Sequence, residues 1–342
     1  MDSSVAGNPE QPEKVSWQKI IAPYQNPDLL RSVWQICNSL IPYFALWILM
    51  VYSLQISYWL TLLLAIPAAG FMIRTFIIFH DCGHGSFFKS KRANDTVGII
   101  TGIITFTPYY HWRHNHAVHH ATVADLDRRG VGDVMTLTVA EYKALNPWKK
   151  LGYRLMRNPL IMFSIGSLAV FLIGHRFYNR KDGRQERNSV LWTNLALLLI
   201  IVLLSAIIGF KAFVLVQLPI LFLGTSVGVW LFYVQHQFEG VYWARHTRWD
   251  YLSAALKGSS FYKLPRVLQW FTGNIGYHHI HHISPRIPNY FLEKCHKEHA
   301  MFQQVRPLTL RSSLKSLSLR LYDEDAQRLV GFRSVRPMKG VN

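Results

Sequence analysis

The stretch YWLTLLLAIPAAGFMIRTFIIFHDCGH, residues 58–84, joins a long apolar run to two histidines at its end. A helix of about 20 apolar residues crosses the hydrocarbon core of a bilayer, so we predict a membrane span over Tyr58–Ile78. His80 and His84 follow directly, and residues four apart lie on the same face of a helix. The stretch therefore predicts a membrane helix that presents two imidazoles on one face where it leaves the bilayer.

Apolar runs of similar length occur on both sides of this stretch. They predict spans over Ile36–Leu54, Val190–Phe210 and Ala212–Tyr233. Val97–Tyr110 and Pro159–Gly174 are shorter and interrupted by Gly or Pro, so each could be a half-span, a re-entrant segment or an interfacial helix. We expect an all-α integral membrane protein with four spans in two hairpins, one or two such extra segments, and a cytoplasmic helical cap that carries the histidine clusters.

The basic residues predict how the spans are oriented. No Lys or Arg occurs between Arg31 and Arg74, and Lys211 is alone between Arg187 and Arg245. Because loops rich in Lys and Arg stay in the cytoplasm, the two short turns between paired spans should face outward. The clusters next to the spans then lie on the cytoplasmic side of the cell membrane.

This orientation divides the chain into three parts. We expect a cytoplasmic N-terminal segment over 1–35, a membrane domain over 36–236 with two histidine clusters in its cytoplasmic loops, and a cytoplasmic C-terminal region over 237–342 with a third cluster. Segment 175–187 has five basic and two acidic residues, so it should also be cytoplasmic. The run Pro159–Gly174 is therefore expected to dip into the bilayer without crossing it.

Composition excludes several other classes of protein. The net charge of +18 comes from residues beside apolar runs, which favours a membrane surface over nucleic acid. Cys37, Cys82 and Cys295 lack CxxC spacing, so neither a disulfide framework nor a thiolate metal site is indicated. No Gly-rich dinucleotide fingerprint or haem-binding motif occurs, so no redox domain that binds a nicotinamide, flavin or haem is predicted in this chain.

Two further clusters repeat the spacing HxxHH, within HWRHNHAVHH at 111–120 and HHIHH at 278–282. At about 100° per residue, three histidines of each cluster fall within an arc of roughly 100°. These are His116, His119 and His120 in one cluster and His278, His281 and His282 in the other. On the same reasoning His111, His114 and His279 point away and are not predicted as ligands.

The histidine-rich set predicts nitrogen-bound transition metals. Imidazole is a ligand for Zn, Cu, Fe and Ni, and the eight clustered histidines exceed what one ion accepts, so we predict two ions with four or five nitrogens each. His236, at the end of the last span, could be a ninth ligand or an interfacial residue. The nearest carboxylates could orient ligand rings by hydrogen bonding their outer nitrogens, or could simply solvate loops and cap helices. These are Asp81, Asp125, Asp127 and Asp133.

The three clusters together resemble the membrane-bound fatty acid desaturases. HDCGH is followed about thirty residues later by HxxHH, and a last HxxHH lies within GYHHIHHISPRIPNY. The surrounding FIIFHDCGHGSFF, TGNIGYHHIHH and SSFYKLP are most similar to bacterial acyl-lipid desaturases of the Δ5 type, which act on phospholipid chains. The resemblance implies that the eight clustered histidines bind iron, with His236 as a further ligand. Some animal members place an Asn four residues before that histidine; Phe232 stands here, and Asn274 or a carboxylate could take that role.

The resemblance also implies an activity. A centre of two irons would use O₂ and two electrons to introduce a cis double bond into phospholipid acyl chains, at Δ5 or else at Δ9 or Δ12. The electrons would come from a ferredoxin or flavodoxin. A histidine-box hydroxylase or ketolase would use similar ligands. A transition-metal transporter is the alternative of another class, but it should carry its histidines within the spans.

Overall fold

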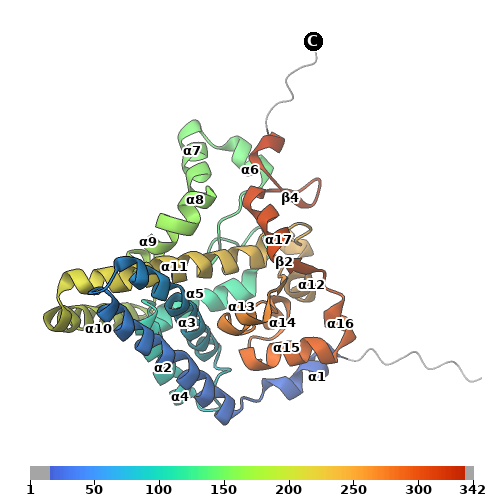
Figure 1. Ribbon diagram of the computed structural model, residues 1–342. Helices are drawn as coiled ribbons and strands as arrows, with labels where there is room; N and C mark the ends of the chain where they lie inside the picture. Colours follow the sequence, from blue (N-terminus) through green and yellow to red (C-terminus); the bar gives the residue numbers. More distant parts are fainter. Residues whose placement is uncertain (1–15, 336–342) are drawn as a thin grey trace, which may run out of the picture.

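Four long helices form two hairpins that make up the body of the computed structural model, which describes residues 16–335 (Figure 1). One hairpin joins α2 (Leu29–Ser53) to α3 (Tyr58–His84), and the other joins α10 (Arg184–Ile208) to α11 (Phe210–His236). Each of these helices is long and apolar enough to cross a membrane. The predicted all-α membrane fold is confirmed.

The helices α3 and α11 lie at the centre of this body. Their most apolar windows are 56% and 39% buried within the protein, against 22% for α2 and 11% for α10. The two central helices pack directly against each other, and the outer two leave most of their apolar surface for lipid. The two spans that were predicted to end in histidines are therefore these two central helices.

A fifth apolar segment, Pro159–Arg176, is also long enough to span by length and composition, and only 6% of it is buried. It comprises α8 (Pro159–Ile161), a π-helical turn η2 (Met162–Gly166), α9 (Ser167–Leu172) and η3 (Gly174–Arg176).

The two ends of this segment lie near the histidine-bearing ends of the central helices. Just before it, Arg157 Nη2 lies 3.3 Å from the Tyr233 hydroxyl, one turn from the end of α11. Beyond it, Ser189 Oγ accepts a hydrogen bond from Tyr110 N, at the start of α5 (Tyr109–Thr122). The re-entrant course expected for this segment stays a prediction.

The other uncertain run, Val97–Tyr110, is divided between two helices. The first, α4 (Lys91–Ile104), has 14 residues and is too short to cross a bilayer. It packs along α3, and the chain then turns at Pro108 into α5.

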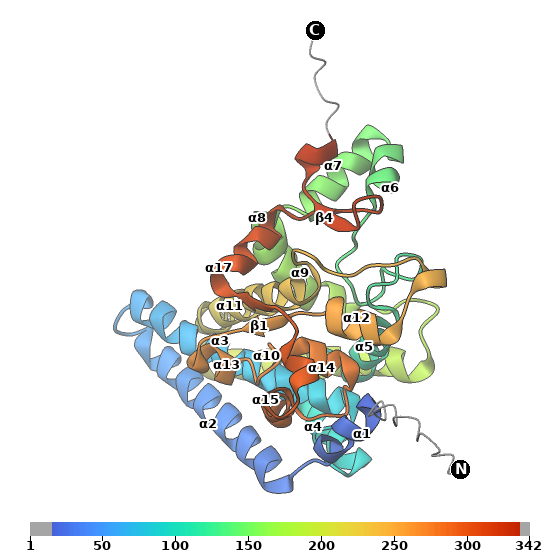
Figure 2. The same ribbon diagram turned by 90° about the vertical axis from the view of Figure 1, so that its right-hand side faces the viewer.

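Short helices and two small sheets form a cap over the ends of α3, α5 and α11, and Figure 2 looks onto this cap. Its remaining helical elements are α1 (Trp17–Ile21), η1 (Ala22–Gln25), α6 (Val139–Ala144), α7 (Pro147–Met156), η4 (His246–Arg248), α12 (Tyr251–Lys257), α13 (Arg266–Phe271), α14 (His278–Ile283), α15 (Asn289–Glu298), α16 (Ala300–Gln303), α17 (Leu310–Ser313), η5 (Leu314–Ser318) and η6 (Phe332–Val335). The parallel pair is β1 (Phe261–Lys263) with β2 (Pro307–Thr309), and the antiparallel pair is β3 (Leu321–Asp323) with β4 (Arg328–Val330).

An apolar cluster fixes α14 against the membrane helices. Ile280 and Ile283 of α14 are buried together with Leu292 of α15 and Ile77 of α3. Since buried apolar side chains of this size each contribute roughly 1.5–3 kcal/mol, the cluster is sufficient to hold the last HHIHH motif at the end of α3.

Candidate metal centre

Four helices bring nine histidines together at the boundary between the helical body and the cap. They come from α3, α5, α11 and α14, and their ligand-capable nitrogens form two groups, each with all atoms within 4.8 Å of one another. The first group is His80, His84, His116, His120 and His281; the second group is His119, His236, His278 and His282. All nine histidines singled out from the sequence lie in these groups.

The end of α3 explains how the first pair is presented. Gly85 caps the helix in the left-handed conformation, with φ of 69°, which a residue without Cβ adopts at little cost. Ser86 N then bonds back to Asp81 O at 3.0 Å. The helix therefore ends at His84, and both imidazoles lie at the end that meets the cap.

The two HxxHH motifs are each divided between the groups. In α5, His116 and His120 belong to the first group and His119 to the second. In α14 the division is reversed, because His278 and His282 belong to the second group and His281 to the first. Each of the two helices thus contributes histidines to both groups, which links the groups into one centre.

Within each group the Nε2 atoms converge at distances that suit a metal ion. His80 and His116 are separated by 3.1 Å, and His120 and His281 by 3.0 Å. In the second group the separation of His236 and His278 is 3.0 Å. Metal–nitrogen bonds of about 2.1 Å at tetrahedral or octahedral angles place ligand nitrogens roughly 3.0–3.4 Å apart. The geometry therefore fits one ion in each group.

The burial of these histidines also supports one metal ion in each group. The Nε2 atoms of His84 and His119 are buried and have no hydrogen-bond partner among residues 16–335, although a buried polar atom normally has one. Burial, reinforced by the neighbouring imidazoles, holds the pKa of His116, His120 and His281 well below the usual range. The rings are therefore neutral at pH 7, which is the form that binds metal.

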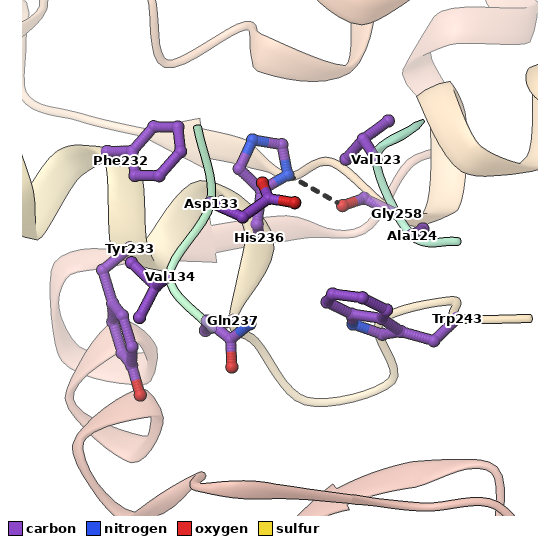
Figure 3. A pocket seen from close by; sticks show the side chains of 10 residues that line it. All are labelled: Val123, Ala124, Asp133, Val134, Phe232, Tyr233, His236, Gln237, Trp243 and Gly258. Carbon is purple, nitrogen blue, oxygen red and sulfur yellow. Dashed lines mark hydrogen bonds between the residues drawn. The ribbon is translucent and has the colours of Figure 1, made fainter. Parts of the chain in front are cut away.

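Three ligand candidates have their outer nitrogen fixed by a hydrogen-bond partner. His80 Nδ1 lies 3.1 Å from Asp81 Oδ1, and His119 Nδ1 bonds to Asp133. His236 Nδ1 bonds to the Gly258 carbonyl at 3.1 Å, and Figure 3 shows this bond with Asp133 beside the ring. Such partners fix the tautomer and the ring orientation of ligating histidines.

Asn289 is a supporting residue that the sequence did not reveal. Its backbone N and its Nδ2 donate to Asp81 Oδ2 at 2.7 and 2.8 Å, so the carboxylate that orients His80 is itself held from α15. The residue follows a proline-containing loop and lies 208 positions from Asp81 in the chain. No local pattern marks it.

The other residues considered for this supporting role lie elsewhere. Asp125 pairs with Arg128 and His246, and Asp127 pairs with Arg245. Neither hydrogen bonds to a histidine of the two groups within the described residues, and their pairings favour the interpretation of these two as loop-stabilising carboxylates. Asn274 accepts from Gln269 and donates to the Asn289 carbonyl, which places it behind the Asp81 anchor and not against a group.

The histidines expected to point away do so. His111 Nε2 lies 3.3 Å from Asp182, and His114 is exposed. His279 is fully buried, but its Nε2 lies 3.3 Å from His296 Nδ1, outside both groups.

An apolar cavity of ≈ 320 Å³ reaches the centre from the membrane side. Imidazoles of both groups, those of His80, His116 and His278, line its inner end. Apolar side chains and glycines of the central helices form its walls, and these include Met72, Phe76, Gly224, Gly228 and Leu231. A flexible apolar ligand in this cavity would pass directly beside the histidine nitrogens.

Five apolar helices and two largely buried histidine groups define a membrane protein with sites for metal ions beside an apolar cavity. Comparison with known families agrees with this class. The model of the family described as fatty acid desaturase matches residues 57–311.

Known relatives carry the same description. The chain is 51% identical over 318 residues to a "Fatty acid desaturase" of Bacillus subtilis (strain 168), covering 93% of this chain and 90% of the relative. It is 30% identical to an "sn-1 acyl-lipid omega-3 desaturase (ferredoxin)" and 28% identical to an "sn-1 oleoyl-lipid 12-desaturase", both of Synechocystis sp. (strain ATCC 27184 / PCC 6803 / Kazusa). Those alignments cover 64% and 65% of this chain and 61% and 63% of the relatives.

The chain belongs to the fatty acid desaturase family. It is a membrane-bound oxidoreductase, and its histidine groups can hold metal ions.

Proposed function

We propose that this desaturase uses O₂ to introduce a cis double bond into the acyl chains of membrane phospholipids, with iron bound by both histidine groups. The observation that carries the proposal is the shared position of the two groups: His80 and His116 of the first and His278 of the second line one apolar cavity. A methylene in that cavity would lie within reach of both metal sites.

The residues present fit two irons. Each group offers four or five imidazole nitrogens, and none of the cysteines contributes. Nitrogen-rich sets of this kind suit iron as well as other first-row metals, and the resemblance of the three histidine motifs to the membrane-bound desaturases supports iron. When bound, the irons would supply the oxidising chemistry that an unactivated C–H bond requires, because it has neither an acidic proton nor a leaving group.

The chain's own residues would hold the substrate and the ligands. Met72 and Phe76 on α3 and Leu231 on α11 line the cavity and exclude water from it, which favours a saturated acyl chain. Asp81 and Asp133 keep the His80 and His119 rings oriented. Two hydrogens leave adjacent carbons, and with two electrons and two protons from outside they reduce O₂ to two waters.

The names of two relatives and the sequence resemblance support the substrate and the electron donor that we propose. Two relatives are named as acyl-lipid or oleoyl-lipid desaturases, and one name includes ferredoxin. We propose a phospholipid acyl chain as substrate, with Δ5 favoured by sequence resemblance, and a ferredoxin or flavodoxin as donor. The site would face the cytoplasm from the cell membrane, with 1–35 and 237–342 flanking a membrane domain over 36–236.

Product analysis tests the proposal. The chain is expressed in a host whose phospholipids carry only saturated chains, and acyl chains are analysed by mass spectrometry after derivatisation of their double bonds. We expect monounsaturated chains with air and none under anaerobic growth, and none with the His116→Ala variant. Hydroxylated or keto products in place of a double bond would reject desaturation, and desaturation of acyl-carrier protein in preference to phospholipid would reject the proposed substrate.

A further inference from the structure

A hollow lined by four arginines lies apart from the metal centre, where α7 and α8 meet the C-terminal turn η6. It has a volume of ≈ 340 Å³. Its lining consists of Arg154, Arg157, Asn158, Pro159, Arg320, Phe332 and Arg333; we call it the arginine pocket.

The charges of the arginine pocket are not neutralised within the described part of the chain. None of the four arginines has a carboxylate oxygen within 4.0 Å among residues 16–335. The half-buried Arg129 and Arg245 each pair with a carboxylate, whereas Arg74, like the four arginines of the pocket, has no carboxylate partner among the described residues. A cluster of like charges without counter-charge is unfavourable, so it favours a bound anion.

Arg157 is the clearest example of an arginine without a counter-charge in the described part of the chain. Its side chain is fully buried, and its Nη atoms bond only to neutral groups, the Gln237 amide at 3.0 Å and the Tyr233 hydroxyl at 3.3 Å among them. Its Nε is buried without a partner in the described residues. Arg320 is also buried and bonds to the carbonyls of Ser316 and Leu319. Two guanidinium groups are therefore held in place without an anion.

Exposed apolar side chains flank the pocket-lining residues of α7 and α8 in the sequence. On α7, Trp148, Leu151 and Leu155 are 81%, 47% and 48% exposed, and their spacing puts them on one helix face. Leu160, at the start of the apolar segment, is 82% exposed. An exposed apolar face with a Trp is typical of a helix lying at the lipid head-group level. Arg154, which lies on the same helix, and Pro159, which directly precedes Leu160, would then lie at that level as well.

We propose that the arginine pocket binds the phosphate of an anionic membrane phospholipid. Guanidinium groups match phosphate oxygens in geometry and form charge-assisted hydrogen bonds with them. Free inorganic phosphate offers the same group, but the exposed Trp148 and Leu160 provide surface that only a lipid would cover. The site is separate from the acyl cavity, since the two share no lining residue.

Lipid binding by the full-length protein tests this site independently of catalysis. The protein in neutral detergent is titrated with phosphatidylglycerol, phosphatidylcholine or inorganic phosphate, and retained lipid is measured by native mass spectrometry alongside the melting temperature. Arg154→Gln combined with Arg333→Gln alters the two exposed members of the pocket. Arg248→Gln is the matched control, because Arg248 is equally exposed and does not line the pocket.

We expect saturable binding of phosphatidylglycerol, weakened at least about tenfold in the double variant and unchanged in the control, in line with the loss of charge-assisted bonds. Phosphatidylcholine should bind more weakly. Equal phosphatidylglycerol binding by the wild type and the double variant would overturn the proposal. Stabilisation by inorganic phosphate with no added effect of phosphatidylglycerol would show free phosphate to be the ligand and overturn the lipid assignment.

Discussion

At the scale of single residues, the nine histidines differ in what holds them. Some are oriented by a partner on the outer nitrogen, as His119 is by Asp133, while the outer Nδ1 atoms of His278 and His282 are buried without a partner among the described residues. The contribution of each side chain to metal binding should therefore vary with its support, and substitutions of the histidines and of their supporting carboxylates test this.

Replacing a histidine of either group should remove metal. We expect His116→Ala and His278→Ala to lose iron and activity, because each deletes a converging nitrogen. His111→Ala and His279→Ala should retain iron, since their rings bond to Asp182 and His296. Metal analysis of purified, folded protein decides the matter. Iron lost from folded His279→Ala but kept in His278→Ala would show that the groups are wrongly assigned.

Weakening a supporting carboxylate should have a smaller, graded effect. Asp133→Asn leaves the shape of the side chain but removes the charge that orients His119, and loss of such partners typically costs about 10–100-fold in metal affinity. Asp81→Asn should act similarly through His80. Asp127→Asn is the control, because Asp127 pairs with Arg245 at the surface. The measurement is iron retention against a competing chelator, and equal retention by all three variants would contradict the role proposed for Asp133 and Asp81.

At the scale of elements, α11 provides both a ligand and a wall of the cavity. Gly228 lies eight residues before His236, about 12 Å along the helix, and a Cβ placed there would meet no atom within 4 Å. The glycine therefore leaves space in the cavity that it lines.

Filling that space should impair the reaction without removing metal. We expect Gly228→Phe to lower turnover of long acyl chains by tenfold or more, while iron content stays at the wild-type level. Gly152→Phe on α7 is a matched control, because it is also a helical glycine with open space around it. Turnover is measured with phospholipids of graded chain length. Undiminished turnover of the longest chains would show that the acyl chain does not use this cavity.

The predicted topology depends on the side of the membrane on which the short segment between α9 and α10 lies. Lys181 is exposed there, and the β3–β4 turn offers exposed Ala326 in the C-terminal region, whereas Leu321 in the adjacent strand is buried. Cysteines placed at 181 and 326 should both be labelled from the cytoplasm and be protected from an impermeant reagent outside. Labelling of position 181 from outside would mean that Pro159–Arg176 crosses the bilayer.

At the scale of the whole molecule, the excess of basic residues in the C-terminal region predicts how an electron donor would dock. Region 237–342 contains sixteen Lys and Arg against seven Asp and Glu, and an acidic donor would be steered to such a surface. With purified enzyme in neutral detergent, subsaturating reduced ferredoxin and phospholipid, turnover should fall steeply as ionic strength rises from about 0.05 M to about 0.5 M. Turnover that is constant over this range would reject electrostatic docking, and turnover without any added donor would reject a separate donor.

The sequence by itself determined the helical membrane fold and the residue types of the centre. Span length and the 100° helical step are local properties, so they can be read from adjacent residues. That is why eight of the nine histidines could be selected, and His111 and His279 set aside, before any fold was known; His236 was added by the family resemblance. The resemblance of HDCGH and the two HxxHH motifs to a family added the metal and the reaction class.

Only the tertiary structure decided how those histidines are divided. His119 joins histidines of α14, and His281 joins histidines of α5, although within each motif the three side chains share one helix face. Whether a ring joins one group or the other depends on the angles at which α5, α11 and α14 meet. Those angles are set by packing between distant segments, whose contacting histidines are 42 positions apart in one case and 161 in another. The same holds for Asn289 beneath Asp81 and for the arginine pocket, since each joins distant segments whose local sequence carries no sign of the contact.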